Sequence, residues 1–257
     1  NFLIAAHSDV GIKKNTNQES LLVKVAQTNL GQVCLCVVCD GMGGLSKGEL
    51  ASATVIRVFE RWFETDFSNM TAKGFDREEL KLQWDNLVLE QNRVLADYAA
   101  RNGVRMGTTI ASLLLIGSEY YVMNVGDSRV YLLNQNMNQL TKDQTFVQYE
   151  LDAGRLTPEQ AQNHPQRNVL LQCVGASEVV NPDFYYGKTF PDSMFLVCSD
   201  GFRHVIAPDE IYTRIDPRNL YDEHAMKDRL ISLTELNKER HEVDNITAVL
   251  IRVCREE

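Results

Sequence analysis

Four aspartates stand at the ends of apolar, strand-like segments of the sequence. Asp40, Asp127 and Asp200 each follow such a segment, and Asp244 precedes the last one. A single aspartate in this position is commonly only a turn former or a helix cap. Four are harder to explain in that way, especially since Asp40 and Asp200 both lie between an apolar strand and a glycine. Because strand ends can converge at one edge of a sheet, we expect the carboxylates to lie together and to need cations that offset their repulsion.

The ligand types indicate which metal such a cluster would hold. Carboxylate oxygens are hard ligands, which suit Mg²⁺ or Mn²⁺ better than Zn²⁺, and the five histidines show no zinc-type spacing. A carboxylate shared by two ions would hold them ~4 Å apart, and a water between them would become a hydroxide able to attack a phosphoryl group in line. The sequence has no C-x5-R signature of a cysteine phosphatase. These residues therefore predict metal-assisted phosphate hydrolysis.

Composition limits the class of protein. The chain has 257 residues, of which 44% are hydrophobic and 24% charged, and a net charge of −9. Such an acidic surface repels a phosphate backbone on average, so we expect no nucleic-acid partner. No apolar run approaches the ~18 residues of a membrane span.

The six cysteines bear on the compartment. Cys36 and Cys39 form a C-x-x-C pair, which could indicate zinc or a redox pair, but both lie in the apolar run 33–39. Residues three apart on a strand point to opposite faces. We therefore interpret the cysteines as reduced and buried, which predicts a cytoplasmic location.

The elements that must position the aspartates follow from hydrophobic periodicity. Long helices are expected at 48–67 and 76–100, and shorter ones at 145–154, 158–163, 208–214 and 222–240. Strands are expected at 2–7, 20–26, 33–39, 109–116, 120–125, 130–133, 168–174, 183–187, 193–198 and 248–253. Helices alternate with strands too rarely for a doubly wound parallel sheet, so a layered α+β architecture is favoured. We expect a single domain over 1–257, with 144–172 as an excursion from its core.

An ordered set of short motifs spans nearly the whole chain. They are SDVG at 8–11, NQES at 17–20, VCDGMGG at 38–44, GTT at 107–109, VGDSRVY at 125–131, LTKD at 140–143, CSDG at 198–201 and DNIT at 244–247. With these motifs the chain resembles bacterial members of the protein phosphatase 2C family, the metal-dependent protein serine/threonine phosphatases. The resemblance implies a four-layer αββα sandwich of two mainly antiparallel sheets flanked by helices, with two Mn²⁺ or Mg²⁺ ions at one end.

The resemblance also implies roles for individual residues. Asp40 would bridge both metals and the Gly41 carbonyl would bind one of them, whereas Asp200 and Asp244 would complete the shell of the other. Asp127, together with Asp200, would match a third, weaker metal site, and Glu19 would hold metal-bound water. Lys14 stands where the family has an arginine that binds the substrate phosphate. The segment 144–172 would be a flap beside the active site that affects substrate choice.

The same resemblance implies the partners. The substrates would be phosphoserine and phosphothreonine proteins, including those of a bacterial Ser/Thr protein kinase that relatives usually oppose.

Several positions depart from the family pattern. Gln18-Glu19 replaces Glu-Asp, Lys14 replaces the arginine, and Asp143-Gln144-Thr145 replaces Asp-His-Ser. These changes leave open a second interpretation, a catalytically weak or inactive pseudophosphatase that acts as a binding or regulatory module. The intact aspartates favour the enzyme, because a chain without catalysis has no need to keep repelling carboxylates together.

Three further residues near the motifs could take part. His7 or His204 could act as an acid, although a structural histidine is favoured for each. Arg203 could bind a phosphopeptide, but we expect an ordinary surface arginine. A nuclease or small-molecule phosphatase is disfavoured by the acidic charge and by the motifs.

Overall fold

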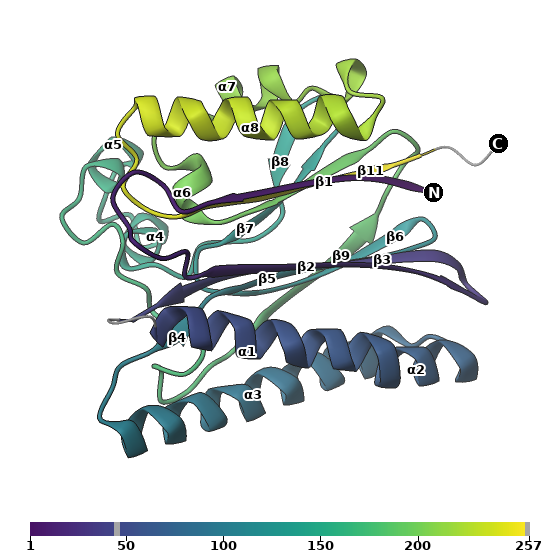
Figure 1. The fold of residues 1–257 in the computed structure, drawn as a ribbon, viewed down its shortest axis with the longest axis horizontal. Helices are drawn as coiled ribbons and strands as arrows, with labels where there is room; N and C mark the ends of the chain where they lie inside the picture. Colours follow the sequence, from purple (N-terminus) through teal and green to yellow (C-terminus); the bar gives the residue numbers. More distant parts are fainter. Residues whose placement is uncertain (44–46, 255–257) are drawn as a thin grey trace.

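The computed structural model describes residues 1–43 and 47–254, and within them two antiparallel sheets lie face to face (Figure 1). The first sheet has the order β1 (Phe2–Asp9), β11 (Ile246–Val253), β10 (Met194–Cys198), β7 (Arg129–Leu133) and β8 (Met137–Gln139). The second has the order β2 (Glu19–Thr28), β3 (Gly31–Met42), β5 (Ile110–Ile116), β6 (Glu119–Val125) and β9 (Asp183–Lys188), and β4 (Gly107–Thr108) pairs with the end of β3.

Helices cover the outer face of each sheet (Figure 1). The second sheet packs against α1 (Lys47–Trp62), which continues through a π-helical turn (Phe63–Phe67) into α2 (Ser68–Lys73), and against α3 (Arg77–Asn102). The first sheet packs against α6 (Asp200–Arg203), α7 (Pro208–Arg214) and α8 (Glu223–Glu239), with a 3-10 turn at Pro217–Asn219. The α+β prediction of two antiparallel sheets flanked by helices is confirmed.

Strand β3 shows how the sequence builds these layers. Its even-numbered Cys34, Cys36 and Val38 pack in the core between the two sheets, whereas Cys39 packs in the core under the helices. This alternation is what strand geometry requires, and it separates Cys36 from Cys39 as predicted. All six cysteines are free thiols.

The structure corrects one predicted strand and adds elements that were not predicted. Segment 168–174 is not a strand: it forms only isolated bridges, from Leu170 to Thr145 and from Val174 to Thr108. Its first five residues belong to the excursion predicted at 144–172, which also holds α4 (Phe146–Asp152) and α5 (Pro158–Gln162). The short elements β4, β8, α2 and α6 were not predicted. Within residues 1–43 and 47–254, no helix is both long and apolar enough to cross a membrane.

The register brings several strand ends to one end of the sandwich. Asp9 at the end of β1 pairs with Ile246 at the start of β11, and Glu19 at the start of β2 pairs with Asp40 near the end of β3. In Figure 1 this is the left-hand end, and the two chain termini lie at the other end.

Candidate metal centre

Three carboxylates from different elements meet at that end of the sandwich. Glu19 opens β2 and lies directly across from Asp40 of β3, while Asp200 opens α6 after β10. One carboxylate oxygen from each of the three residues lies within 4.8 Å of the other two. This spacing allows the three residues to ligate a common metal ion.

Two glycines allow the backbone segments that carry these carboxylates to approach one another. A Cβ atom on Gly41 would lie 2.0 Å from the carbonyl oxygen of Gly48, and a Cβ atom on Gly201 would lie 2.1 Å from that of Asn245. Each glycine that follows a predicted metal ligand is therefore required by close packing. Gly44, the last glycine of the motif, lies outside the described residues.

Neighbouring polar side chains fix the main chain of the centre. The Asp40 amide donates to Thr109 Oγ1 at 3.0 Å, and the Thr109 amide donates to the Asp40 carbonyl at 2.9 Å. Asn245 links two loops, since its Oδ1 accepts from the Gln18 amide at 3.0 Å and its Nδ2 donates to the Val10 carbonyl at 2.8 Å. Both residues lie in the sequence motifs, but neither was predicted to have a role.

Burial and mutual repulsion disfavour the ionised form of the carboxylates. Burial raises the pKa of Glu19 to about 8, and the charges of Asp200 and Asp244 add to this effect, while the nearby hydroxyls of Thr247 and Ser199 offset part of it. The pKa of Asp40 lies well above its usual range because of burial and of the charges of Glu19 and Asp200. Burial also raises the pKa of Asp200. The cluster therefore resists full ionisation unless cations enter it.

Unpartnered oxygens indicate that a divalent cation fits this site. Both carboxylate oxygens of Glu19, which is only 6% exposed, and Oδ1 of Asp200 are buried without a hydrogen-bond partner among residues 1–43 and 47–254. Buried carboxylates without donors are rare unless they coordinate a metal. An all-oxygen donor set fits Mg²⁺ or Mn²⁺.

The other predicted site residues surround this group. Asp244 lies just before β11, half-exposed, and Lys14 Nζ lies 3.1 Å from its Oδ1. Asp127 lies in the turn between β6 and β7, where burial, followed by the charge of Asp200, raises its pKa to about 7. The charges of both aspartates act on Asp40, although neither belongs to the group of three carboxylates whose oxygens lie within 4.8 Å.

Arg203 is not the surface arginine that the sequence predicted. Its side chain is only 14% exposed, and its Nη2 donates to the Asp127 carbonyl at 2.8 Å and lies 3.4 Å from Asp143 Oδ2. Arg129 holds the same Asp143 carboxylate through two hydrogen bonds of 2.7 and 2.6 Å. The i, i+3 spacing from Asp200 to Arg203 is the one signal in the sequence that could have indicated this position.

The two histidines near the motifs have structural partners. His204 Nδ1 lies 2.9 Å from Oε2 of Glu242, which is buried. Burial and the charge of Lys227 lower the pKa of His7. These contacts agree with the structural interpretation favoured for both residues.

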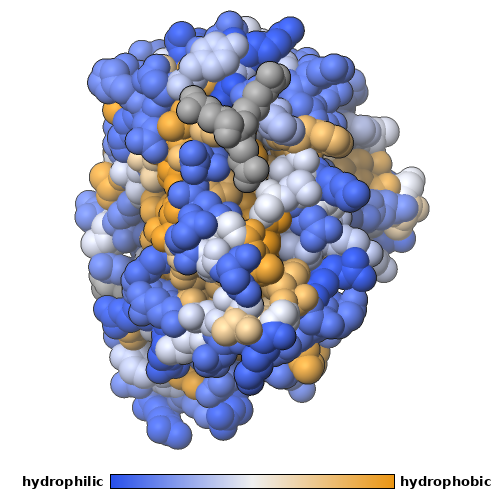
Figure 2. Space-filling view, turned by 90° about the vertical axis from the view of Figure 1, so that its right-hand side faces the viewer, coloured by the Kyte–Doolittle hydropathy of each residue, from blue (hydrophilic) through white to orange (hydrophobic). Residues whose placement is uncertain are grey.

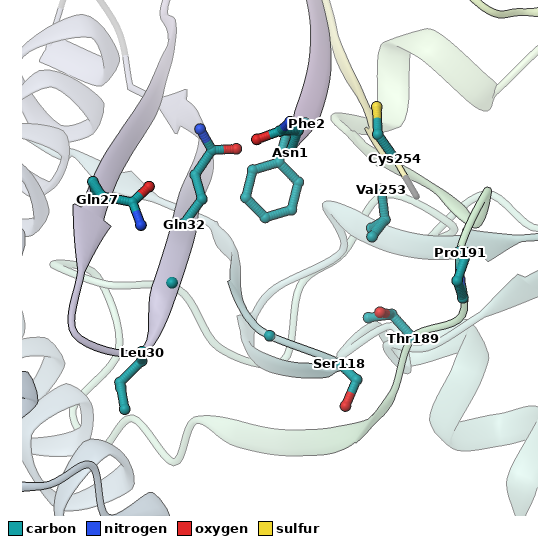
Figure 3. Close-up of a pocket in the computed structure, with 12 residues that line it drawn as sticks. Asn1, Phe2, Gln27, Leu30, Gln32, Ser118, Thr189, Pro191, Val253 and Cys254 are labelled. Atoms are coloured by element: carbon teal, nitrogen blue, oxygen red, sulfur yellow. The ribbon is translucent and has the colours of Figure 1, made fainter. Parts of the chain in front are cut away.

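A cavity of about 790 Å³ lies at the opposite end of the sandwich, away from the carboxylates. Figure 2 looks onto that end, where apolar surface gathers in the middle of a hydrophilic rim. Figure 3 shows Phe2, Gln32, Thr189 and Val253 among the residues that line the cavity, and within residues 1–43 and 47–254 none of the lining side chains is charged.

Comparison with known proteins gives consistent results. The family model described as protein phosphatase 2C matches residues 12–250. The serine/threonine phosphatase stp of Listeria innocua is 33% identical over 223 residues, which are 84% of this chain and 83% of that protein. Protein phosphatase PhpP of Streptococcus pneumoniae is 30% identical over 258 residues, covering 99% of this chain and 98% of its own length.

Solved structures show the same similarity. The serine/threonine phosphatase of S. agalactiae superposes with a TM-score of 0.86 and 28% identity, covering 98% of this chain and 100% of that one. The catalytic domain of the serine threonine protein phosphatase PstP in complex with 2 manganese ions gives a TM-score of 0.78 and 28% identity, with 99% and 100% coverage.

Proposed function

The chain belongs to the protein phosphatase 2C family of serine/threonine phosphatases, and we propose that it hydrolyses phosphoserine and phosphothreonine in proteins at the carboxylate centre described above. The observation that carries this proposal is the meeting of Glu19, Asp40 and Asp200, where buried oxygens of Glu19 and Asp200 have no hydrogen-bond partner in the described part of the chain. A relative solved with two manganese ions supports the same number and type of ion here.

The proposed ligands follow from the position of each residue. Asp40, which lies directly across from Glu19 in the β2–β3 pair, would be shared by two ions, with the Gly41 carbonyl as a further ligand of one. Asp200 and Asp244 would complete the shell of the other ion, and Glu19 would hold water at the centre. Bound divalent cations supply positive charge for the phosphoryl group and lower the pKa of water, so that it can attack phosphorus. A third ion at Asp127 would meet the charge of Arg203, which lies on that side.

Lys14 is proposed to bind the substrate phosphate. Its amine lies at the edge of the centre beside Asp244, and both side chains are partly exposed. An ammonium group there can attract the dianionic phosphate and hold it over the carboxylates. It does so as a point charge, without the two parallel hydrogen bonds of an arginine.

The proposed partners are phosphoproteins, including the targets of a Ser/Thr protein kinase that this enzyme would oppose. Support for the kinase comes only from the family resemblance. The cytoplasmic location stays a prediction from the cysteines, and the single domain and the substrate-selecting flap at 144–172 stay predictions as well.

Hydrolysis of a phosphothreonine peptide with Mn²⁺ tests the proposal, with EDTA and Asp200→Asn as controls. We expect Mn²⁺-dependent phosphate release that either control abolishes. No turnover by a folded protein that binds Mn²⁺ would favour the pseudophosphatase. Faster hydrolysis of DNA or free nucleotides than of the peptide would revive the nuclease or small-molecule interpretation.

A further inference from the structure

Arg203 places a permanent positive charge beside two of the acidic residues. It lies in the single turn of α6, three residues after Asp200, so the two side chains share one face of that turn. Its Nη2 reaches across to the Asp127 carbonyl at 2.8 Å. The guanidinium is therefore fixed between the segment that carries Asp127 and the helix that begins with Asp200.

The arginine is held there by the protein and not by solvent. Asp143 Oδ2 lies 3.4 Å from Arg203 Nη2, and the same carboxylate is fixed by Arg129. The Nε of Arg203 is buried and has no hydrogen-bond partner among residues 1–43 and 47–254. Because Asp143 is shared with Arg129, part of the Arg203 charge is left to act on other carboxylates.

The charge of Arg203 acts on Asp127 and Asp200. Burial raises the pKa of both residues, the charge of Asp200 adds to the effect on Asp127, and among charged groups Arg203 exerts the largest lowering effect on both. A metal ion between these two carboxylates would have to approach the guanidinium, which repels it. The group of three carboxylates at Glu19, Asp40 and Asp200 does not include Asp127.

We propose that Arg203 acts as a built-in cation on the Asp127–Asp200 side of the centre and thereby limits the number of metal ions that the centre binds. This inference rests on the proposed metal centre. Arg203 acts through its neighbours and does not touch the substrate. Its guanidinium supplies the positive charge that a further ion would otherwise bring to Asp127 and Asp200. Ions are then confined to the part of the centre where Glu19, Asp40 and Asp200 meet, with Asp244 beside it.

Counting bound Mn²⁺ by calorimetry, and by electron paramagnetic resonance of the free ion, tests the inference. We expect Arg203→Gln to bind one more ion per chain than the unchanged protein, and Arg203→Lys, which keeps the charge, to bind the same number. Adding Asp127→Asn to Arg203→Gln removes the extra ion. Arg129→Gln loosens the same Asp143 without removing the Arg203 charge, so its ion count stays unchanged.

A second variant keeps the test decisive if Arg203→Gln does not fold. Asp127→Asn alone leaves the ion count unchanged if Arg203 already occupies that side, and the loss of one ion overturns the inference. A folded Arg203→Gln that binds the same number of ions, or fewer, also overturns the inference. If its melting temperature is lower as well, the role of Arg203 is purely structural. If the unchanged protein binds no Mn²⁺ at all, the proposed metal centre itself is wrong.

Discussion

Among single residues, Glu19 is the one at which folding and metal binding make opposite demands. Its carboxylate is buried beside two other acids, and neither of its oxygens makes a hydrogen bond within residues 1–43 and 47–254, although the hydroxyls of Thr247 and Ser199 lie near. We expect Glu19→Gln to raise the unfolding free energy of the EDTA-treated protein by about 1 kcal/mol or more at mildly alkaline pH, because an amide carries no charge to bury. The same change weakens Mn²⁺ binding at least about tenfold, since a ligand charge is lost.

Thermal melts with EDTA and calorimetric Mn²⁺ titrations measure the two effects of Glu19→Gln. Glu78→Gln, on the exposed first turn of α3, is the matched control and changes unfolding by less than about 0.5 kcal/mol. If Glu19→Gln lowers the unfolding free energy in EDTA as well as the Mn²⁺ affinity, the prediction is wrong and Glu19 is only a packing residue.

Lys14 carries a prediction about substrate binding. Lys14→Arg restores a guanidinium that can hold phosphate through two hydrogen bonds. We expect the KM for a phosphothreonine peptide to fall roughly three- to tenfold with kcat nearly unchanged. Lys13→Arg makes the same exchange one residue away and leaves KM unchanged. A rise in kcat alone, or no change, would remove Lys14 from phosphate binding.

Residue types at strand ends were enough to predict the carboxylates, but not the groups that hold them. Asp40 and Asp200 could be found because an acidic residue directly beside an apolar strand is visible in the sequence, whereas Glu19 was identified only through the family resemblance. The burial of Arg203 was not visible, since it depends on Asp127 and Asp143, which lie 76 and 60 positions away in the chain.

At the scale of elements, the single turn of α6 positions Asp200. A methyl group on Gly201 would lie 2.1 Å from the Asn245 carbonyl, which is backbone and cannot move alone. Gly201→Ala must therefore shift α6 or the start of β11. We expect the unfolding free energy to fall by about 2 kcal/mol or more and Mn²⁺ affinity to fall with it.

Gly154→Ala is the control for Gly201→Ala. Gly154 has a φ of +69°, but a Cβ atom there would meet nothing within 4 Å. Strain alone should cost about 1 kcal/mol, with metal affinity unchanged, as denaturant unfolding and calorimetry can measure. Unchanged metal affinity in a destabilised Gly201→Ala would mean that α6 does not set the position of Asp200.

The predictions of helices and strands failed for one apolar segment without a full strand partner and for elements too short to show a hydrophobic period. The strand predicted at 168–174 is apolar, but Val169 and Leu171 are exposed and the segment forms only isolated bridges. An apolar run becomes a strand only where a neighbouring strand offers a free edge. The single turn of α6 and the two residues of β4 are too short to show any period.

At the scale of the whole molecule, the fold collects carboxylates at one end of the sandwich. They meet where β1, β2, β3 and β11 begin or end (Figure 1), whereas the side chains that line the cavity at the far end are uncharged in the described part of the chain. The metal-free fold therefore carries unfavourable electrostatic energy that is concentrated at one site. Its stability should depend on how many of those carboxylates are protonated.

The pH dependence of stability follows from two of these groups. Glu19 has a pKa of about 8 in the folded chain against an ordinary 4.5, and Asp127 has about 7 against 3.8. Between these values the folded chain binds more protons than the unfolded chain, so the unfolding free energy falls as pH rises. His7, with its lowered pKa, acts in the opposite direction below neutral pH, so the effect is clearest from about pH 7 to about pH 8.

We therefore expect the melting temperature in EDTA to fall across that range, and Glu19→Gln to flatten the decline. Saturating Mn²⁺ reverses the trend, because metal binding displaces the protons and becomes tighter as pH rises. Calorimetry in two buffers of different ionisation enthalpy measures the protons released on binding. A melting temperature in EDTA that stays level or rises over this range would mean that the carboxylates are already ionised in the metal-free protein, and that the folded chain neutralises them by other means.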